Sequence, residues 1–528
     1  MRQLGKLTKQ YKNYFFIILL SLFSFLVNFH YGFIGVMPMD NFVLYNGGFK
    51  ILKGYIPFND YWLVTGPLLD YLNALIFYLL GVTWKSFIIH SSIINCLVAL
   101  LNYKLFKQLG LSIKFSFFYS ALFSILFYPV VGTPFVDHHS TFFSLIAFYF
   151  FIFSIKKDSK RYLFFIPFFL VLSFLSKQTP TAYILFSLIF LGSIYFYISK
   201  NKKIIFWTFF YGSIFSILFL ITFFFFTKIN LQNFFLQYLH FAVSIGEFRF
   251  SEIGFSLKDI FSSLKFITIL SLIFLIITFK LFFYYKKINN EILILISINV
   301  LTLTMIVHQQ LTFNQEFIFF LIPLLAAAIH AYYYKVFKNK VFLTIIIFIS
   351  IFAVTKYHLR FNEHRKFNEL EKTDLSKAID SGSVLDKSLD GLKWISYKFP
   401  NNPEEELKEL KTNIEIIKKD KSNKSILTDY QIIGPILNEY DFSPNQWHHP
   451  SVSFPVRNQK YYLEYKNYFI RNLLKNKIEN IYEINVGKEL ILPLVIEKDC
   501  FEEEIKSKSL TKFKLIKSCE DFKIDENS

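Results

Sequence analysis

Cysteine is scarce in this chain, with three residues among 528. No C-x-x-C pair occurs, so the common motif for zinc or thiol redox chemistry is absent. The sequence also lacks a G-x-x-x-x-G-K-[ST] loop and a G-x-G-x-x-G turn after a strand, which are the usual signatures of nucleotide phosphate binding. These absences argue against the common classes of soluble nucleotide-dependent and zinc-dependent proteins.

Ionisable residues are rare in the middle of the apolar runs that fill the first two-thirds of the chain. Hydrophobic residues make up 53% of the sequence, 70 residues are Phe and the mean hydropathy is +0.39, which exceeds the usual values of soluble chains. A run of about 18 to 25 apolar residues can cross a hydrocarbon core of roughly 30 Å. Eleven runs occur, near residues 14–34, 84–103, 113–132, 135–155, 162–177, 179–199, 204–227, 260–285, 290–307, 317–334 and 341–356. The sequence therefore predicts a polytopic α-helical membrane protein with about 11 transmembrane helices.

The distribution of Lys and Arg predicts the orientation of these spans, because short loops rich in them stay on the cytoplasmic side. Basic clusters lie at residues 2–12, 104–114, 156–161, 200–203, 286–287 and 335–340. With eleven spans, all of them fall on the side of a cytoplasmic amino terminus. The net charge of +18 is then explained by membrane orientation and a Lys-rich tail, with no nucleic acid as partner. The first run lacks a small-residue cleavage site, so we expect it to be a retained span.

The composition changes abruptly after residue 356. Residues 357–528 have little Phe and alternate Lys with Glu, and the odd number of spans places them outside the cytosol as an extracytoplasmic or periplasmic domain. Helices are expected at 403–420 and 458–476, and strands at 425–430, 480–484, 490–496 and 511–517. This order predicts a small α/β domain. Cys500 and Cys519 lie within it, and either a disulfide or two unpaired thiols fits the sequence.

The first predicted outer loop, residues 35–83, contains two candidate surface helices. Gly66–Pro67 precedes an apolar stretch of about 14 residues that ends at Gly81, with Pro suited to a first helical turn and Gly to a helix stop. A stretch of this length is too short for a span and is expected to be interfacial or re-entrant. Upstream, Phe42, Tyr45, Phe49 and Leu52 recur at helical spacing and can place one face on the membrane. The Gly47–Gly48 pair weakens that helix by about 2 kcal/mol.

Residues capable of chemistry gather at the predicted outer boundary of the membrane. They are Asp40, Asp137, His138, His139, Lys177, Glu247, Arg249, Glu252, His308 and Glu316. An ion-coupled transporter usually places such groups near the bilayer midplane, where they line the pathway. Their position at the outer boundary favours a protein that acts on a molecule in the outer leaflet.

The order of motifs in the first outer loop resembles that of a family. An acid after the first span, then KGYIPFND (residues 53–60), GPLLDYLNA (66–74) and a closing Leu-Gly (80–81) resemble the first outer loop of GT-C membrane glycosyltransferases. The similarity is to those related to lipid A aminoarabinose transferases, protein O-mannosyltransferases and rhizobial-type sugar transferases. It extends over residues 1–356 by topology, and to the first loop and the Asp137 and Lys177 turns by motif.

The resemblance implies a sugar transfer from a polyprenyl-phosphate donor in the outer leaflet to a lipid, glycan or protein acceptor of the cell envelope. It implies a plasma-membrane (inner-membrane) location, Asp40 as catalytic base and Asp137 as the second recurrent acid. Lys177 and Arg249 are the candidate donor-phosphate ligands, since such transfer needs cations at the departing phosphate. Related enzymes carry a Lys before the second surface helix, where this chain has Thr65 and Gly66. The absence of a D-x-D triplet agrees with a lipid-linked donor.

Each assignment has a simpler alternative. Asp40 can cap the helix that follows it, and Lys177 and Arg249 can anchor spans at lipid headgroups. His138 and His139 can orient substrate, whereas a divalent metal on Asp40, Asp137 and His138 is the alternative cofactor. Asp60 and Asp70 are expected to be loop and helix-cap residues. His308 and Glu316 are candidates for an acceptor cleft.

Two other functions stay open at the level of sequence. A lipid-linked glycan transporter or flippase would need polar residues along a route through the spans, which the sequence largely lacks. A non-catalytic envelope-assembly protein would tolerate the loss of Asp40, Asp137 and Lys177 together.

Overall fold

The structure, a computed structural model, describes residues 2–253, 257–311, 317–337, 339–439, 442–484 and 489–522. The chain forms two compact units, each built from segments that are distant in the sequence. The bundle unit contains Met1–Gly32, Ile88–Thr222 and Glu252–Lys366, and the sheet unit contains Phe33–Phe87, Phe223–Ser251 and Phe367–Ser528. The sequence was expected to divide once, after residue 356. In the structure the first outer loop belongs to the same compact unit as the tail.

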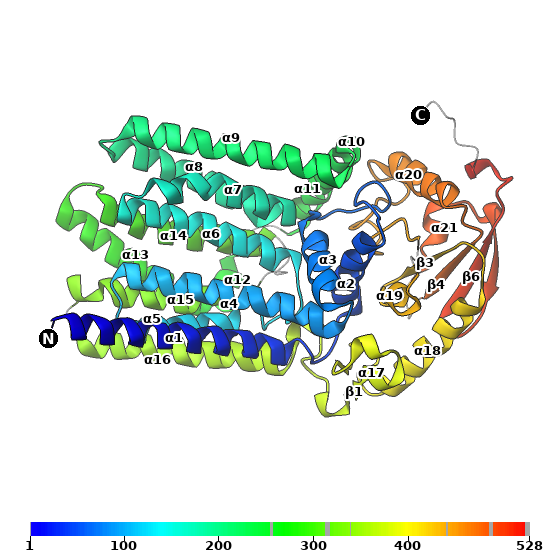
Figure 1. The fold of residues 1–528 in the computed structure, drawn as a ribbon, viewed down its shortest axis with the longest axis horizontal. Coiled ribbons are helices and arrows are strands. Elements are labelled where there is room, and N and C mark those ends of the chain that lie inside the picture. Colours follow the sequence, from blue (N-terminus) through cyan, green and yellow to red (C-terminus); the bar gives the residue numbers. More distant parts are fainter. Residues whose placement is uncertain are drawn as a thin grey trace. The chain divides into compact units, whose positions relative to one another are not determined.

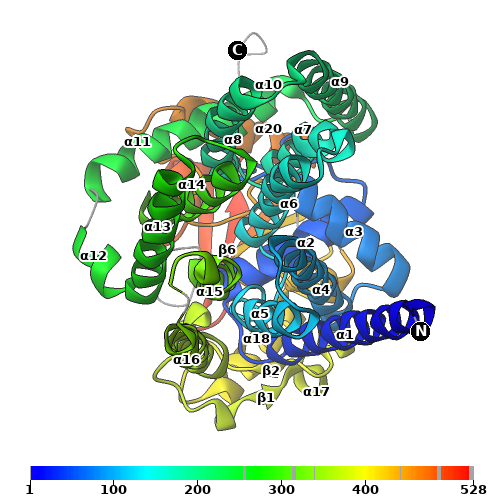
Figure 2. The ribbon, with the colours of Figure 1, turned by 90° about the vertical axis from the view of Figure 1, so that its left-hand side faces the viewer.

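Nine helices of the described residues are long and apolar enough to cross a membrane. They are α1 (Arg2–Tyr31), α4 (Trp84–Leu109), α6 (Val136–Lys157), α8 (Gln178–Ile198), α9 (Lys202–Thr227), α13 (Lys265–Tyr285), α14 (Asn290–Leu311), the segment Ile318–Lys335 around α15 (Leu321–Tyr332), and Lys340–Asn368, which begins with α16 (Lys340–Tyr357). The long helices run alongside one another in Figure 1, and Figure 2 views them from one end. The chain is thus a polytopic helical membrane protein.

The two other predicted spans form shorter helices. Helix α5 (Ile113–Leu126) has 14 residues and α7 (Lys160–Ser176) has 17, which correspond to about 21 and 26 Å at 1.5 Å per residue. Helix α5 ends early because Phe127 leaves the helical conformation, with φ −90° and ψ −92°, and Pro129 follows two residues later. The predicted number of eleven spans therefore stays a prediction.

Small hydroxyl side chains hold the centre of the bundle unit together. Helix α6 is almost wholly buried, and Ser140 and Ser144 on it lie 3.0 and 2.8 Å from Ser173 of α7. Ser173 also lies 2.6 Å from Thr181 of α8. Small polar residues of this kind allow close approach and satisfy each other in an apolar medium. Helix α9 differs, since Phe206, Trp207 and many of its other side chains are exposed, as expected for a helix that faces lipid.

Both surface helices predicted in the first outer loop are present, as α2 (Pro38–Leu52) and α3 (Leu68–Leu80). The predicted membrane-facing side of α2 is wrong, because Phe42, Tyr45 and Phe49 are buried. The Phe42 ring stacks on Trp394 of the tail at 5.2 Å between centroids. Helix α3 instead exposes apolar side chains, namely Leu75, Tyr78, Leu79 and Leu80.

The Gly47–Gly48 pair permits the contact between α2 and α3. A Cβ atom at Gly47 would lie 2.2 Å from Asp70 Oδ1, and one at Gly48 would lie 2.7 Å from the Cβ atom of Asn73. Two glycines are unfavourable in an isolated helix. Here they are required because α3 packs directly on the α2 backbone, so the cost in helix propensity is offset by packing.

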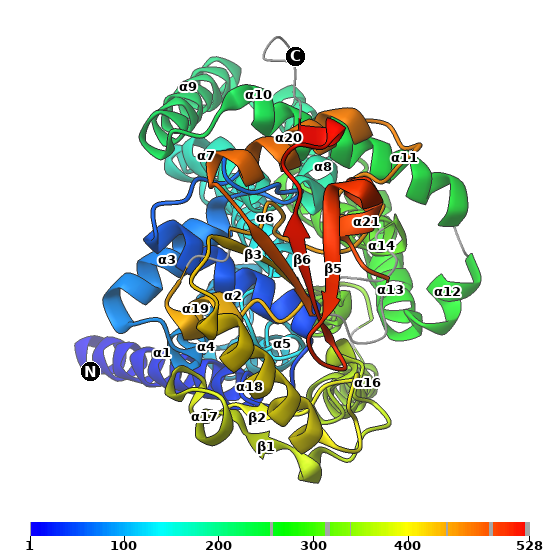
Figure 3. The same ribbon diagram turned by 90° about the vertical axis from the view of Figure 1, so that its right-hand side faces the viewer.

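The sheet of the tail has four strands in the order β3–β4–β6–β5. They are β3 (Lys424–Thr428), β4 (Asn480–Ile484), β5 (Phe501–Ile505) and β6 (Leu510–Leu515), with β3 and β4 parallel and the other pairs antiparallel. Helices α18 (Pro403–Lys419) and α20 (Tyr462–Lys475) lie where the sequence predicts them. Figure 3 shows β6 beside the edge strand β5.

One of the predicted strands is wrong, and one strand of the four-stranded sheet was not predicted. Residues 490–496 contain the short helix α21 (Leu492–Val495), whose start is held by Glu483 through hydrogen bonds from the backbone N–H groups of Ile491 and Leu492. The edge strand β5 has the sequence FEEEI and exposes four of its five residues. Because it lacks the alternation of apolar and polar residues, its sequence did not predict a strand.

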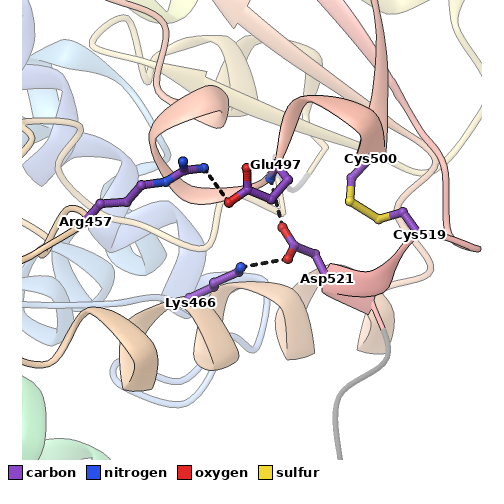
Figure 4. The surroundings of a disulfide bond; sticks show 6 residues. All are labelled: Arg457, Lys466, Glu497, Cys500, Cys519 and Asp521. Carbon is purple, nitrogen blue, oxygen red and sulfur yellow. Dashed lines mark hydrogen bonds and ion pairs between the residues drawn. A yellow bond between two sulfur atoms is a disulfide. The ribbon is translucent and has the colours of Figure 1, made fainter.

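Cys500 and Cys519 form a disulfide, with their Cα atoms 5.3 Å apart. This decides between the two alternatives that the sequence left open. Figure 4 shows the bond beside ion pairs that hold the same end of the chain. Asp521 accepts from Lys466 Nζ at 2.7 Å and from the backbone N–H of Glu497 at 2.8 Å, so the last described turn is fixed by both covalent and polar contacts.

The segment before α2 is joined to the tail by backbone hydrogen bonds. Strands β1 (Ile379–Asp380) and β2 (Lys393–Trp394) form a two-stranded sheet, and Ile34 bridges to Lys393 in parallel register. Gly35 N–H donates to Lys393 O at 2.9 Å and Val36 N–H to Ile395 O at 3.0 Å. Gly35 has φ +69°, a conformation that glycine adopts without steric cost. The tail therefore sets where α2 begins within the sheet unit.

We predict that Gly47→Ala destabilises the protein. The new methyl group would overlap the Asp70 carboxylate and Gln446 Nε2, 2.2 and 2.9 Å away, and overpacking of this kind costs about 1–3 kcal/mol. The measurement is the thermal unfolding midpoint of the full chain in detergent. Gly192→Ala is the control, since no atom lies within 4 Å of its Cβ position and a helical Gly→Ala change alone is expected to be neutral or stabilising. An unchanged midpoint for Gly47→Ala would contradict the close approach of α2 and α3.

Candidate functional site

Asp137 and Lys177 form a largely buried ion pair in the bundle unit. Lys177 Nζ lies 2.7 Å from Asp137 Oδ1 and 2.8 Å from Oδ2, and the side chains are 1% and 16% exposed for Asp137 and Lys177. The sequence predicted a functional role for each residue, and the structure brings the two together. A single ammonium that faces both carboxylate oxygens is a charge-assisted contact, the stronger class of hydrogen bond.

Local structure explains why the two residues meet. Asp137 lies in the first turn of α6, where a negative charge is favoured by the helix dipole. Lys177 lies between α7 and α8 in an extended conformation, with φ −159° and ψ 145°. Its carbonyl oxygen accepts from Thr181 Oγ1 at 2.9 Å. The Lys177 side chain thus leaves a fixed turn, and a donor phosphate at Lys177 would share its ammonium with Asp137.

His138 and His139 point to different surroundings on α6. His139 Nδ1 is hydrogen-bonded to the hydroxyl of Tyr128, and its Nε2 lies 3.0 Å from Nε2 of His90. The ring of His138 instead lies among aromatic rings, 5.2 Å from Tyr128 and 5.6 Å from Phe127 between centroids. The histidine pair His90–His139 was not expected from the sequence, because His90 lies on another span, 49 residues earlier.

The structure gives less information on three other predicted residues, His308, Glu316 and Arg249. His308 is buried in α14, with its ring 5.8 Å from that of Tyr183. Glu316 lies outside the described residues. Arg249 belongs to α11 (Ala242–Ile253) of the sheet unit, and its side chain lies outside what the structure describes. Within the ranges that the structure describes, no group of three His, Cys, Asp or Glu residues could hold a metal ion.

Asp40 lies in the first turn of α2 in the sheet unit and is half-buried. The N-cap residue of this helix is Met37, which makes no side-chain cap bond, and Asp40 follows three residues later. The side chain of Asn41 accepts from the Met37 N–H at 2.7 Å. The start of α2 is therefore held by Asn41. Burial raises the pKa of Tyr397 of the tail, and the charges of Asp429, Glu369 and Asp40 raise it further.

Asp70 was expected to be a helix-cap residue and is instead part of a buried polar network. It is 2% exposed, accepts from the Tyr61 hydroxyl at 2.9 Å and from Gln446 Nε2 at 3.2 Å. Burial raises the pKa of Asp70 to about 7, although both hydrogen bonds and the charge of Lys50 lower it. Lys50 is itself buried, with Nζ 4.9 Å from the centre of the Tyr61 ring.

The network continues into the tail loop that carries Gln446. Gln431 Nε2 donates to the carbonyl of Gln446, and Asn46 of α2 donates to Gln431 Oε1 at 3.1 Å. Trp62 N–H donates to Pro444 O at 2.6 Å. The loop therefore binds the first outer loop within the sheet unit. Sequence spacing could not reveal the network, since Asp70 and Gln446 are 376 positions apart.

We predict that Asp137→Asn destabilises the protein by about 3 kcal/mol, since removal of one partner leaves a buried charge uncompensated. Addition of Lys177→Met to Asp137→Asn should restore part of this loss, so the two effects are not additive. Thermal unfolding in detergent measures both. Glu404→Gln is the control, because Glu404 pairs with Lys408 on an exposed helix face, where such pairs contribute less than about 1 kcal/mol. Additive losses would argue against a direct interaction.

We also predict a pH dependence that belongs to Asp70. The folded-state pKa of about 7 exceeds that of an unfolded Asp, about 3.9, so the folded state retains a proton that the unfolded state releases. Stability relative to Asp70→Asn should therefore fall as the pH rises from 4 to 7, with a slope of up to about 1.4 kcal/mol per pH unit, and level off above that range. Unfolding midpoints between pH 4 and 8 test this.

The matched control for this titration is Glu415→Gln, which changes an exposed acid of the same unit. It should follow the wild type at every pH. If wild type and Asp70→Asn keep a constant difference between pH 4 and 7, the buried carboxyl does not titrate as described.

Comparisons with known proteins add no family to this picture. No protein-family model matches the chain, and no curated protein sequence matches it. What can be said of function therefore rests on the residues of the chain and on their geometry. Among the described residues, the predicted site residues include the Asp137–Lys177 pair of the bundle unit and Asp40 in the first turn of α2 in the sheet unit.

Proposed function

We propose that the chain is a plasma-membrane glycosyltransferase that moves a sugar from a polyprenyl-phosphate donor to an acceptor of the cell envelope. Asp40 is the general base in this proposal. Asp137 is the second acid of the proposed site, and Lys177 and Arg249 are the candidate ligands of the donor phosphate. The carboxyl-terminal part is extracytoplasmic and the amino terminus is cytoplasmic.

The position of Asp40 is the observation that supports this proposal most. Asp40 is the acid in the first turn of α2, and its neighbour Asn41 accepts from the Met37 N–H at 2.7 Å. A half-buried acid in the first turn of a helix is favoured as a carboxylate by the helix dipole, and a carboxylate is the form that a general base requires.

The reaction has a simple balance of atoms. The acceptor oxygen forms a bond to the anomeric carbon of the sugar while its proton moves to the Asp40 carboxylate. The bond from the anomeric carbon to the phosphate oxygen breaks, and its electron pair stays with the polyprenyl phosphate. A phosphate leaving group needs no proton from a second carboxylic acid, unlike the sugar oxygen of glycoside hydrolysis. A cation such as Lys177 stabilises the charge that develops on the phosphate.

The polar residues inside the bundle unit argue against the transporter alternative. Asn28 Nδ2 donates to Ser91 at 2.9 Å, and Asn95 Nδ2 donates to the Ser24 carbonyl at 2.8 Å. Tyr149 donates to Asn102 at 2.9 Å. These side chains join helix to helix, which is the usual role of polar residues in membrane bundles. They support packing of the spans more than a route through them.

The test compares wild type with Asp40→Asn in lipid discs that contain polyprenyl-phosphate sugars and envelope extract. We expect the isosteric change to lower sugar transfer by 10²-fold or more, in line with the loss of a general base, about 10²–10⁴-fold. Glu464→Gln, which removes an exposed first-turn acid of α20, should leave transfer unchanged. If wild type transfers no sugar from any donor, or if Asp40→Asn transfers as well as wild type, the proposal is wrong.

A further inference from the structure

Arg365 is a buried cation of the bundle unit that the proposed reaction does not use. Its side chain is 1% exposed. Nη1 donates to the Pro129 carbonyl at 2.9 Å, and Nη2 donates to the Val131 carbonyl at 2.8 Å. A guanidinium group is planar and presents its N–H groups in a fixed fork. Two hydrogen bonds from one fork to carbonyls two residues apart therefore fix the main chain of the loop between α5 and α6.

The backbone of Arg365 is itself in an uncommon conformation. Its φ of +45° lies in the left-handed region, which residues with a Cβ atom rarely adopt. Such conformations persist where the surrounding structure holds them, and they are concentrated at functional sites. The two side-chain hydrogen bonds to the loop provide that hold for Arg365.

Two other polar side chains bind the middle of the same loop. Asn28 Nδ2 donates to the Gly132 carbonyl at 3.2 Å, and Ser91 Oγ donates to it at 2.7 Å. A Cβ atom at Gly132 would lie 2.9 Å from Gly32 Cα and 3.1 Å from Arg365 Nη2. The loop is thus packed closely against the end of α1 and against Arg365, with little room to shift.

The bound loop leads directly into the turn that carries Asp137. The Phe135 N–H donates to the Tyr128 hydroxyl at 3.2 Å, which joins the two ends of the loop. Pro134 precedes Phe135, and its ring restricts the backbone there. Few freely rotating bonds therefore lie between the loop and Asp137, so a movement of the loop is passed on to the Asp137 carboxylate.

We propose that Arg365 is a positioning residue for the Asp137–Lys177 pair. By holding residues 128–135, it keeps the Asp137 carboxylate where it aligns the Lys177 ammonium for the donor phosphate. The inference rests on the function proposed above and adds a residue to its phosphate site. Arg365 acts through the loop and not on the donor, because its two terminal nitrogens are engaged by the loop carbonyls.

The experiment separates donor binding from stability. Full-length wild type, Arg365→Lys and Arg365→Met in lipid discs receive a polyprenyl-phosphate sugar at varied concentration, with envelope extract as acceptor. KM for the donor is measured beside the thermal unfolding midpoint. Tyr149→Phe is the matched control, because it removes another buried hydrogen bond of the bundle unit, from the Tyr149 hydroxyl to Asn102 at 2.9 Å. Ser91→Ala is a milder variant of the same loop contact, since it removes one donor to Gly132 O.

We expect Arg365→Met to raise KM for the donor by about 10²-fold, the cost of a misplacement of about 1 Å, and Arg365→Lys by about tenfold, because it keeps the charge without the fork. Ser91→Ala should raise it several-fold. Tyr149→Phe should lower the unfolding midpoint and leave KM for the donor unchanged. In the Asp137→Asn/Lys177→Met double variant, Arg365→Lys should not raise KM further, because the pair that it positions is absent.

Three outcomes would overturn the inference. If Arg365→Lys lowers only the unfolding midpoint, as Tyr149→Phe does, Arg365 supports the fold alone. A further rise of KM in the double-variant background means that Arg365 does not act through the pair. If the Arg365 variants do not fold, an unchanged KM in Ser91→Ala contradicts the role of the loop.

A wild type that transfers no sugar from any donor is a distinct result, in which the proposed function fails. The link between Arg365 and Asp137 is then measured by unfolding midpoints alone. Losses of Arg365→Lys and Asp137→Asn that add up in the double variant would show that the two residues are not coupled.

Discussion

The backbone hydrogen bonds between residues 33–36 and 393–395 are the constraint on which the sheet unit depends. They join the segment that leaves the first span to a tail more than 350 positions later in the chain. Because α2 follows this segment directly, its position is set by the tail. The stacking of Phe42 of α2 on Trp394 of the tail is in keeping with that arrangement, because Trp394 lies within the paired segment.

Buried polar groups then make this arrangement specific. Asp70, Tyr61 and Gln446 bond to one another, and Gln431 extends the chain of contacts to Asn46 on α2. Apolar packing alone tolerates shifts of one helix along another, whereas each of these bonds has a single geometry. The bundle unit uses the same principle in a different medium, with Ser140, Ser173 and Thr181 joining three helices.

The sequence identified some residues of the candidate site and not others. Charged residues are easily recognised in a sequence where their neighbours are apolar, so Asp137 and Lys177 could be predicted as site residues. The structure shows that these two residues form an ion pair. Asp40 could be selected by its place after the first span. The contact of Asp70 with Gln446 could not be predicted, because nothing in the tail marks Gln446 and the two residues are far apart in the chain. Asp70 was predicted to be a helix-cap residue for the same reason, because the residues next to it in the sequence do not indicate that it is buried.

The sequence by itself determined the class of the protein, the approximate position of its apolar helices, the two short helices of the first outer loop and most of the tail helices and strands. Those features follow from apolar run length, helical spacing and Pro or Gly at helix ends, which act within a few residues. Only the tertiary structure decided that the first outer loop folds with the tail, that Phe42 faces Trp394 and that Cys500 pairs with Cys519. Each of these depends on contacts between residues separated in the chain, which local patterns do not record.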